Sequence, residues 1–196
     1  MADKMLIVAG GTPFDTRPFG GLKYDGSTFS LNKPKIFNNA RKLNNAGGNY
    51  RRVWRCGYPS WDGMGKILDW KDPQYFPLMR EYLSIIHQPI QGAGATQLPP
   101  GARIWFELFD GFADEAYLSN PSEARKMIQA MFANLGDIPY LDFSTGNELN
   151  SKDWCDFVEF VIFPEFLEVE AGKVQAILTS QNCFCLGKHI LRRIGG

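Results

Sequence analysis

The feature of this sequence that most constrains its fold is a regular alternation of strand-like and helix-like segments. Short apolar or β-branched runs predict five strands, at residues 5–10, 50–56, 103–109, 138–145 and 174–180. Apolar residues at helical spacing predict four helices between them, which begin near Pro34, Asp72, Asn120 and Asp153. Strands joined through helices run parallel, so the pattern predicts an α/β protein with a parallel sheet.

The predicted helices carry their own start signals and apolar faces. Asp72-Pro73 and Asn120-Pro121 each combine a capping residue with a proline for the first turn. The residues expected on the buried faces are Ile36, Phe37, Ala40 and Leu43, then Tyr75, Met79, Tyr82, Leu83 and Ile86, then Ala124, Ile128, Met131, Phe132 and Leu135. Residues 12–33 are rich in Gly, Pro, Asp and Ser, which predicts a loop.

Length and composition favour one globular domain that spans residues 1–196, because hydrophobic residues make up 44% of the chain. The 21 basic residues equal the 21 acidic ones. This balance argues against nucleic acids and anionic membranes as partners. No run has the length of a membrane span or the form of a signal peptide, so we expect a soluble protein.

The cysteines and histidines do not form a recognisable metal or disulfide pattern. Cys183 and Cys185 are spaced too tightly for a zinc knuckle, and Cys56 and Cys155 lie far from them in sequence. The two histidines are also widely separated. The sequence therefore predicts reduced thiols, no metal site and no cofactor.

Two parallel architectures fit the strand and helix pattern: an open doubly wound sheet and a closed (β/α)8 barrel. The first turn, residues 10–13, lacks the glycine spacing of a dinucleotide or phosphate loop, which disfavours a nucleotide-binding open sheet. Barrel enzymes gather functional residues where strands end. This chain has such residues within or just after its predicted strands: Asp15 and Arg17; Arg52, Trp54, Arg55, Tyr58, Trp61 and Asp62; Asp110; Asn147 and Glu148; Gln181 and Asn182. The sequence thus favours a barrel.

Two motifs carry a resemblance to a known family. The fourth predicted strand is followed by Gly146-Asn147-Glu148, and the second is preceded by Gly48-Asn49 and contains Arg52-Val53-Trp54. Both are similar to cellulase- and mannanase-type retaining glycoside hydrolases of the (β/α)8-barrel superfamily. The resemblance implies that Glu148 is the general acid/base, that Asn147 binds the sugar 2-hydroxyl, and that Arg52 is a buried arginine that holds the catalytic carboxylates.

The residue types suit this chemistry, although each has a purely structural alternative. Glycoside cleavage needs a carboxylic acid that protonates the leaving oxygen and then activates water. Trp54, Tyr58 and Trp61 are candidates to stack on sugar rings. Tyr58 and Trp61 are equally well explained as loop residues that are anchored by burial. Core packing is the favoured role of Trp54, and a turn or cap is the favoured role of Asp110, which otherwise contacts substrate. Arg52 is equally well explained as a structural partner of Glu107.

The chain departs from the family in its length. A complete barrel takes about 250 residues, whereas about five βα units are visible here. The retaining mechanism needs a second carboxylate, which the family takes from strand seven, and no such strand is visible. We therefore expect an N-terminal piece of a longer enzyme, a protein that completes its sheet by self-association, or an inactive descendant that binds carbohydrate or serves in an assembly.

Overall fold

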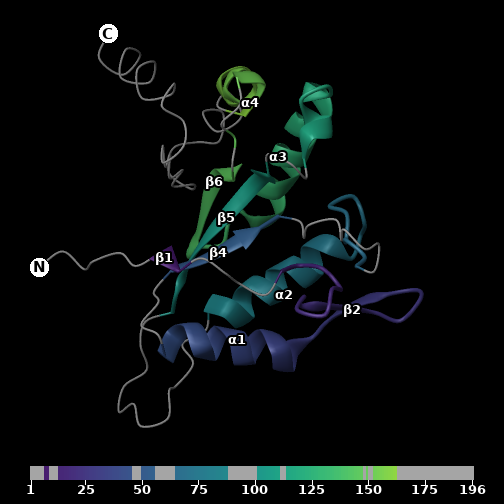
Figure 1. Ribbon diagram of the computed structural model, residues 1–196, viewed down its shortest axis with the longest axis vertical. Helices are drawn as coiled ribbons and strands as arrows, with labels where there is room; N and C mark the ends of the chain where they lie inside the picture. The colour runs from purple at the N-terminus through teal and green to yellow at the C-terminus, as the bar shows by residue number, and fades with distance from the viewer. Residues whose placement is uncertain are drawn as a thin grey trace, which may run out of the picture. The chain divides into compact units, whose positions relative to one another are not determined.

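A computed structural model describes residues 7–8, 13–45, 50–55, 65–87, 101–110, 114–147, 149 and 152–162. Its main sheet has four described strands in the spatial order β1, β4, β5, β6 (Figure 1). These strands are β1 (Ile7–Val8), β4 (Tyr50–Trp54), β5 (Arg103–Asp110) and β6 (Leu141–Asn147). They coincide with four of the five strands that the sequence predicts; the fifth, residues 174–180, lies outside the described residues.

The order of these strands in space follows their order in the chain. β1 pairs with β4 in parallel, with Ile7 beside Tyr50 and Val8 beside Arg51. A helix lies between β4 and β5 and another between β5 and β6, as parallel connections require. In a doubly wound sheet the order reverses part of the way across. No reversal occurs among the described strands, so the described residues form a mixed α/β structure in which no switch point of a doubly wound sheet is seen.

The predicted helices form close to their predicted positions. They are α1 (Lys33–Asn45), α2 (Tyr75–His87), α3 (Pro121–Leu135) and the short α4 (Lys152–Phe157), which continues as the π-helical turn η2 (Val158–Ile162). Asp72 precedes α2 and accepts a hydrogen bond from the Gln74 N–H through its carboxylate (2.8 Å). Asn120 caps α3 by accepting from the Glu123 N–H (3.2 Å).

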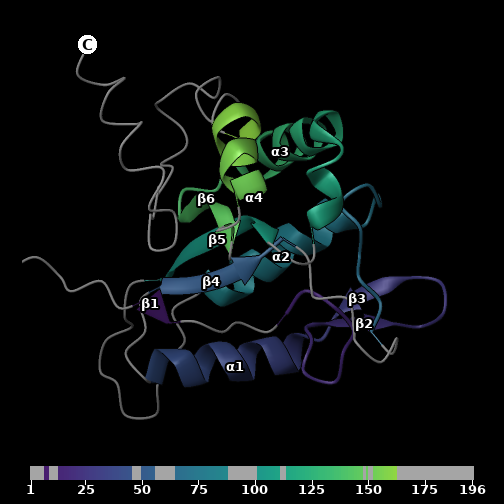
Figure 2. The ribbon, with the colours of Figure 1, turned by 45° about the horizontal axis from the view of Figure 1, so that its top comes forward.

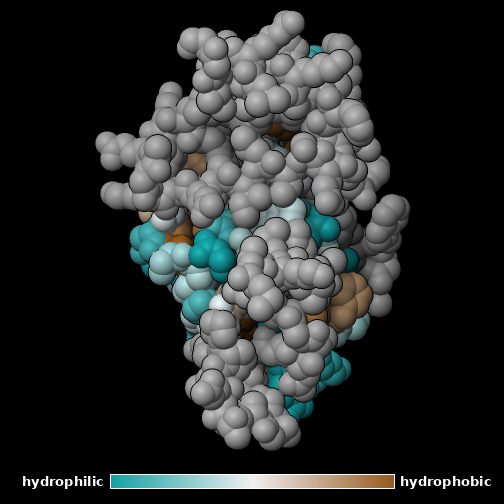
Figure 3. Space-filling model, turned by 90° about the vertical axis from the view of Figure 1, so that its left-hand side faces the viewer, coloured by the Kyte–Doolittle hydropathy of each residue, from teal (hydrophilic) through white to brown (hydrophobic). Residues whose placement is uncertain are grey.

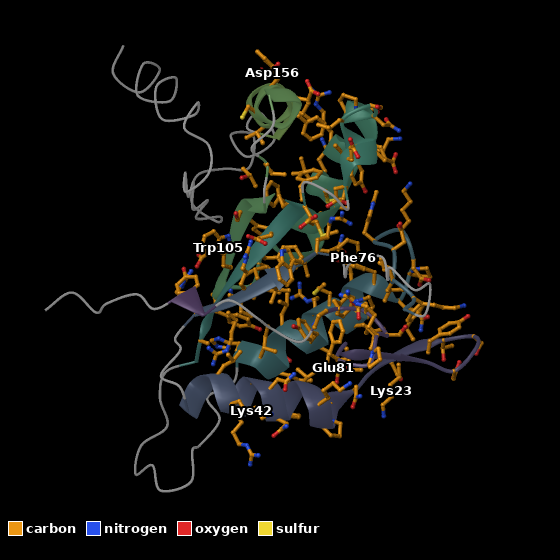
Figure 4. All side chains as sticks on the ribbon, in the orientation of Figure 1. Lys23, Lys42, Phe76, Glu81, Trp105 and Asp156 are labelled. Carbon is orange, nitrogen blue, oxygen red and sulfur yellow. The ribbon has the colours of Figure 1, made fainter. Side chains whose placement is uncertain are left out.

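The buried helix faces agree with the sequence except on α1. All five residues expected on α2 and all five expected on α3 are buried. On α1, Ile36 and Ala40 are buried, whereas Leu43 is only half-buried. Phe37 is 40% exposed, so its predicted place in the core is wrong. Helices α1 and α2 lie side by side (Figure 2), and Lys33 of α1 forms an ion pair with Glu81 of α2, which Figure 4 labels.

The segment predicted as a loop contains a β-hairpin. β2 (Leu22–Tyr24) pairs with β3 (Phe29–Leu31) in antiparallel register. Leu22 and Leu31 are buried opposite one another, and the Tyr24 and Phe29 rings lie 4.7 Å apart. Strands of three residues are too short for a period of two to stand out from a Gly- and Ser-rich background, so the sequence prediction missed them.

The hairpin turn is organised by Asp25. Its carboxylate accepts hydrogen bonds from the backbone N–H groups of Thr28 (2.8 Å) and Ser27 (2.9 Å) and from both of their hydroxyls. Gly26 follows with φ +107°, a conformation that favours glycine. The turn is therefore closed by side-chain to backbone hydrogen bonds.

These hydrogen bonds predict an unusual acid titration. The Thr28 N–H, followed by the Ser27 N–H and the two hydroxyls, lowers the pKa of Asp25 well below its ordinary 3.8. A carboxyl group whose pKa is lower in the folded state than in the unfolded state stabilises the fold at pH values above its unfolded-state pKa. This stabilisation is lost as the pH falls through the folded-state pKa. A carboxyl ¹³C NMR titration should find Asp25 ionised below pH 3.8, and Thr28→Ala should move its midpoint upward. A midpoint in Thr28→Ala equal to that of the wild type would contradict this hydrogen-bond account.

Close contacts divide the chain into two compact units. The first unit comprises Met1–Phe106 with Ile138–Leu141, and the second comprises Glu107–Asp137 with Asp142–Gly196. The core of the first unit includes Phe14, Tyr75 and Tyr82, whose rings meet at centroid distances of 5.6 Å around Phe14. In the second unit, Phe132 of α3 meets Phe143 of β6 edge-on at 4.9 Å.

Three large apolar side chains are exposed in the described part of the chain: Phe19, Phe37 and Phe160. On the face drawn in Figure 3, hydrophilic and apolar described residues are interspersed. None of the described helices combines the length and apolar character that a membrane crossing requires.

Candidate functional site

The predicted catalytic motif lies at the carboxyl end of β6. Gly146 and Asn147 are the last two residues of this strand, which is fourth in the order of the sheet. Glu148 lies outside the described residues, as do Tyr58 and Trp61, and the Asn147 side chain is not described. The site is therefore built from the described residues that flank position 148 on both sides.

Gly146 fixes the approach of β6 to β5. Its φ is +153°, and a Cβ atom at this position would lie 2.2 Å from the Phe109 carbonyl oxygen. No side chain fits so close to a backbone carbonyl. The glycine of the Gly-Asn-Glu motif is therefore required by the contact between the ends of two strands.

The residue after Glu148 is anchored as well. Leu149 is 4% exposed, and its Cδ1 lies 3.0 Å from the position that a Cβ on Gly146 would occupy. The Leu149 carbonyl oxygen lies 3.9 Å from the Sγ of Cys155 on α4, within reach of a weak S–H···O hydrogen bond. The chain is thus held immediately before and after the two residues Asn147 and Glu148.

Asp110 is the last residue of β5 and is buried, and two hydrogen bonds with Asp114 close a turn at its backbone. Its N–H donates to the Asp114 carboxylate (2.9 Å), while the Asp114 N–H donates to the Asp110 carbonyl (3.0 Å). The turn role predicted for Asp110 thus agrees with its backbone bonds, whereas contact of its side chain with substrate stays a prediction. Asp114 is a second buried carboxylate that the sequence analysis missed, because it lies in a turn without a periodic pattern.

A polar face runs along β5 and β6 in the second unit. The Ile104 N–H donates to the Tyr140 carbonyl (2.8 Å), which in a parallel ladder places Ile104 beside Leu141. The apolar face of β6 then includes Leu141 and Phe143, and Phe143 contacts α3. By alternation, Glu107, Asp142 and Ser144 belong to the opposite face, and all three are buried.

These three polar residues were not predicted as site residues. Asp142 and Ser144 alternate with Leu141 and Phe143, so a period of two was present in the sequence. This alternation predicts a strand but does not mark its polar residues as a site.

β4 places its arginines on different faces. Arg51, Val53 and Arg55 are all buried, whereas the alternate residues Arg52 and Trp54 are half-buried. The Arg52 guanidinium lies over the Trp54 ring, 5.1 Å from its centroid. The resemblance implies a buried Arg52, but the fully buried arginine is Arg51, because Arg52 belongs to the less covered face. Burial also lowers the pKa of the Arg51 guanidinium.

Two further contacts fix the first unit beyond β1 and β4. The Tyr75 hydroxyl donates to the Arg55 carbonyl (2.6 Å), which ties the start of α2 to the end of β4. Asp15 is completely buried and pairs with Arg17, whose Nε donates to the Asp15 Oδ2 at 2.7 Å. Burial, with a smaller effect from the Asp15 carboxylate, raises the pKa of the Tyr82 phenol.

No set of three or more His, Cys, Asp or Glu side chains within the described ranges has an arrangement that could hold a metal ion. Comparisons of the chain with protein-family models, with curated proteins and with solved structures found no significant match in any of the three.

Proposed function

We propose that this chain is the N-terminal part of a glycoside hydrolase barrel that acts on β-linked polysaccharide, with Glu148 as general acid/base. The observation that carries the proposal is the strand order. β1, β4, β5 and β6 follow one another in space as in the chain, and Gly146 and Asn147 of the Gly-Asn-Glu motif end the fourth of them. The first four strands of a (β/α)8 barrel have this order, and functional residues of barrels lie at the carboxyl ends of strands.

The chemistry assigns one role to each motif residue. Glu148 donates a proton to the glycosidic oxygen as the bond to the anomeric carbon breaks. Asn147 hydrogen-bonds the 2-hydroxyl. Arg52, with its guanidinium over the half-buried Trp54 ring, contributes positive charge on the face of β4 that is less covered. Tyr58 and Trp61 supply aromatic faces for sugar rings.

The reaction also needs a nucleophile or base beyond Glu148. In retaining enzymes the two carboxyl groups are about 5–5.5 Å apart, and the resemblance assigns the second one to strand seven. We infer that this second group comes from outside the 196 residues, from further chain or from a second copy. The chain alone is then equivalent to a glycosidase from which the nucleophile has been deleted.

This equivalence gives a direct test. Azide, added to the protein with an aryl β-glucoside or β-mannoside, attacks the anomeric carbon while the proton of Glu148 goes to the leaving aryl oxygen. The products are an α-glycosyl azide and the phenol. Glu148→Gln should lower the rate on phenyl glycosides by about 10²–10⁴-fold and the rate on dinitrophenyl glycosides much less, because an activated leaving group needs no proton.

The matched control is Glu115→Gln, which removes an exposed carboxylate from η1 (Glu115–Tyr117). It should leave both rates unchanged. Equal rates for wild type and Glu148→Gln on phenyl glycosides would reject the role of Glu148. Binding of β-glucan or β-mannan without any glycosyl azide would instead support the inactive carbohydrate-binding descendant.

A further inference from the structure

The connections that follow β1 and β4 carry a cluster of cationic and aromatic side chains. Residues 13–24 follow β1 and residues 65–71 follow β4, and both segments belong to the first unit. The Thr16 N–H donates to the Lys66 carbonyl (3.2 Å), and the Lys66 N–H donates to the Thr16 hydroxyl (2.7 Å). These two bonds hold the backbone of Lys66 against the first connection. In barrels, the connections after strands line the face that binds substrate.

The Lys66 ammonium lies over the ring of Tyr24, 4.2 Å from its centroid. This ring is itself fixed, because its hydroxyl donates to the Gly26 carbonyl (2.7 Å) and the Phe29 ring packs on it at 4.7 Å. We call Lys66, Tyr24 and Phe29 the cationic platform. Lys66 is exposed, and none of the carboxylates in the described ranges forms an ion pair with it. An aromatic ring thus holds the ammonium in place while its charge stays accessible to an anion.

The first connection also presents an exposed apolar ring. Phe19 is 56% exposed, and the Arg17 guanidinium lies 4.7 Å from its centroid. The charge of Arg17 is balanced by the buried Asp15, whereas no such carboxylate balances Lys66 within the described part of the chain. A pyranose ring has an apolar face of C–H groups that suits an aromatic ring. A neutral sugar would leave the ammonium without a counter-charge, so the cluster fits a sugar that carries a negative charge.

We propose that the substrate of this chain is an acidic β-linked polysaccharide, whose uronic acid carboxylates pair with Lys66. The inference rests on the proposed function and names its substrate class. The carboxylate of a uronic acid stands at the edge of the pyranose ring, so the same polymer presents apolar faces to Phe19 and charge to the cationic platform. Attraction between exposed charges is modest, and it therefore selects acidic over neutral sugars by a few-fold.

Two matched ligands test this selection: a tetramer of β-1,4-linked glucuronic acid, and cellotetraose. They share backbone and linkage, and they differ only in whether the exocyclic carbon is a carboxylate or a hydroxymethyl group. In calorimetric titrations of the full chain at low ionic strength, the glucuronate tetramer should bind about three- to fivefold more tightly. Added salt should reduce this preference. Lys66→Gln should abolish it without changing the affinity for cellotetraose, and Lys66→Arg, which keeps the charge, should retain it.

The matched control is Lys23→Gln. Lys23, which Figure 4 labels, is exposed on β2, and alternation along the strand places it on the opposite face of the hairpin from Tyr24. This variant should keep the wild-type preference, whereas Phe19→Ala should weaken the binding of both tetramers by the same factor.

Three results would overturn the acidic substrate: equal affinities of the wild type for the two tetramers, an equal loss of preference in Lys23→Gln and Lys66→Gln, or a tetraglutamate peptide that binds as tightly as the glucuronate tetramer. The last would identify an acidic peptide as the ligand. If the azide reaction still depends on Glu148, the proposed function stands after any of these results. If Lys66 selects the glucuronate tetramer but no glycosyl azide forms, the acidic class of ligand is supported and the hydrolase activity fails.

Discussion

Gly146→Ala is expected to lower the free energy of unfolding by about 3–5 kcal/mol. Two effects add at this residue. The positive φ of +153° strains an alanine, and its Cβ would lie 2.2 Å from the Phe109 carbonyl oxygen and 2.8 Å from the carbonyl carbon. Both neighbours are backbone atoms of β5. The steric clash is therefore relieved only if the two strands separate, because rotation of a side chain does not move these atoms. Urea unfolding followed by fluorescence measures the loss.

Gly26→Ala is the matched control for this prediction. Gly26 also has a positive φ, +107°, but no atom lies within 4 Å of the position that its Cβ would take. Its replacement by alanine should therefore cost about 1 kcal/mol, the backbone strain alone. Equal losses for the two variants would show that the contact with Phe109 is not the reason for glycine at position 146.

Much of the fold could be predicted because the signals are local. Asn120-Pro121 marks the start of α3, and the spacing of Ala124, Ile128 and Leu135 identifies its buried face. For β4 and β5, a continuous run of apolar or β-branched residues was enough. Such signals depend on the near neighbours of each residue, which the sequence contains.

Features that depend on distant contacts were predicted less well. Phe37 has the spacing of a core residue, but it is exposed, and spacing alone does not tell which side of a helix other elements cover. Arg51 and Arg52 are adjacent and chemically identical, so only the position of the strand in the sheet decides which is buried. The requirement for Gly146 depends on the Phe109 carbonyl, 37 residues earlier in the sequence.

The same distinction applies to the candidate site. The motif Gly146-Asn147-Glu148 could be recognised in the sequence, since its residue types suit glycoside chemistry. Its supporting residues could not, because Leu149, Cys155 and Phe109 are ordinary apolar residues and a lone cysteine until their contacts are known. A functional residue can be recognised in a sequence when its side chain has a suitable reactive group. A residue that only packs beside the site has a common apolar side chain, so the sequence does not distinguish it from other core residues.

Asp15→Ala is expected to destabilise the protein by about 3 kcal/mol, at the lower end of the range for breaking a buried ion pair. The Asp15 carboxylate is fully buried and accepts from both the backbone N–H (3.0 Å) and the Nε (2.7 Å) of Arg17. Without it, the guanidinium loses a counter-ion in a place where its side chain is only 12% exposed. Because of this remaining exposure, water can solvate the guanidinium, which limits the loss of stability.

A double-mutant cycle with Arg17→Ala isolates the interaction of this pair. Because removal of both charges leaves neither uncompensated, the double variant should be more stable than the sum of the two single losses predicts, by about 1–3 kcal/mol. Asp15→Asn, which keeps an acceptor for the Arg17 N–H, should lose less than Asp15→Ala. Strictly additive losses in the cycle would mean that the stability near Asp15 comes from backbone contacts such as Leu22 N–H to the Asp15 carbonyl (2.9 Å), and not from the ion pair.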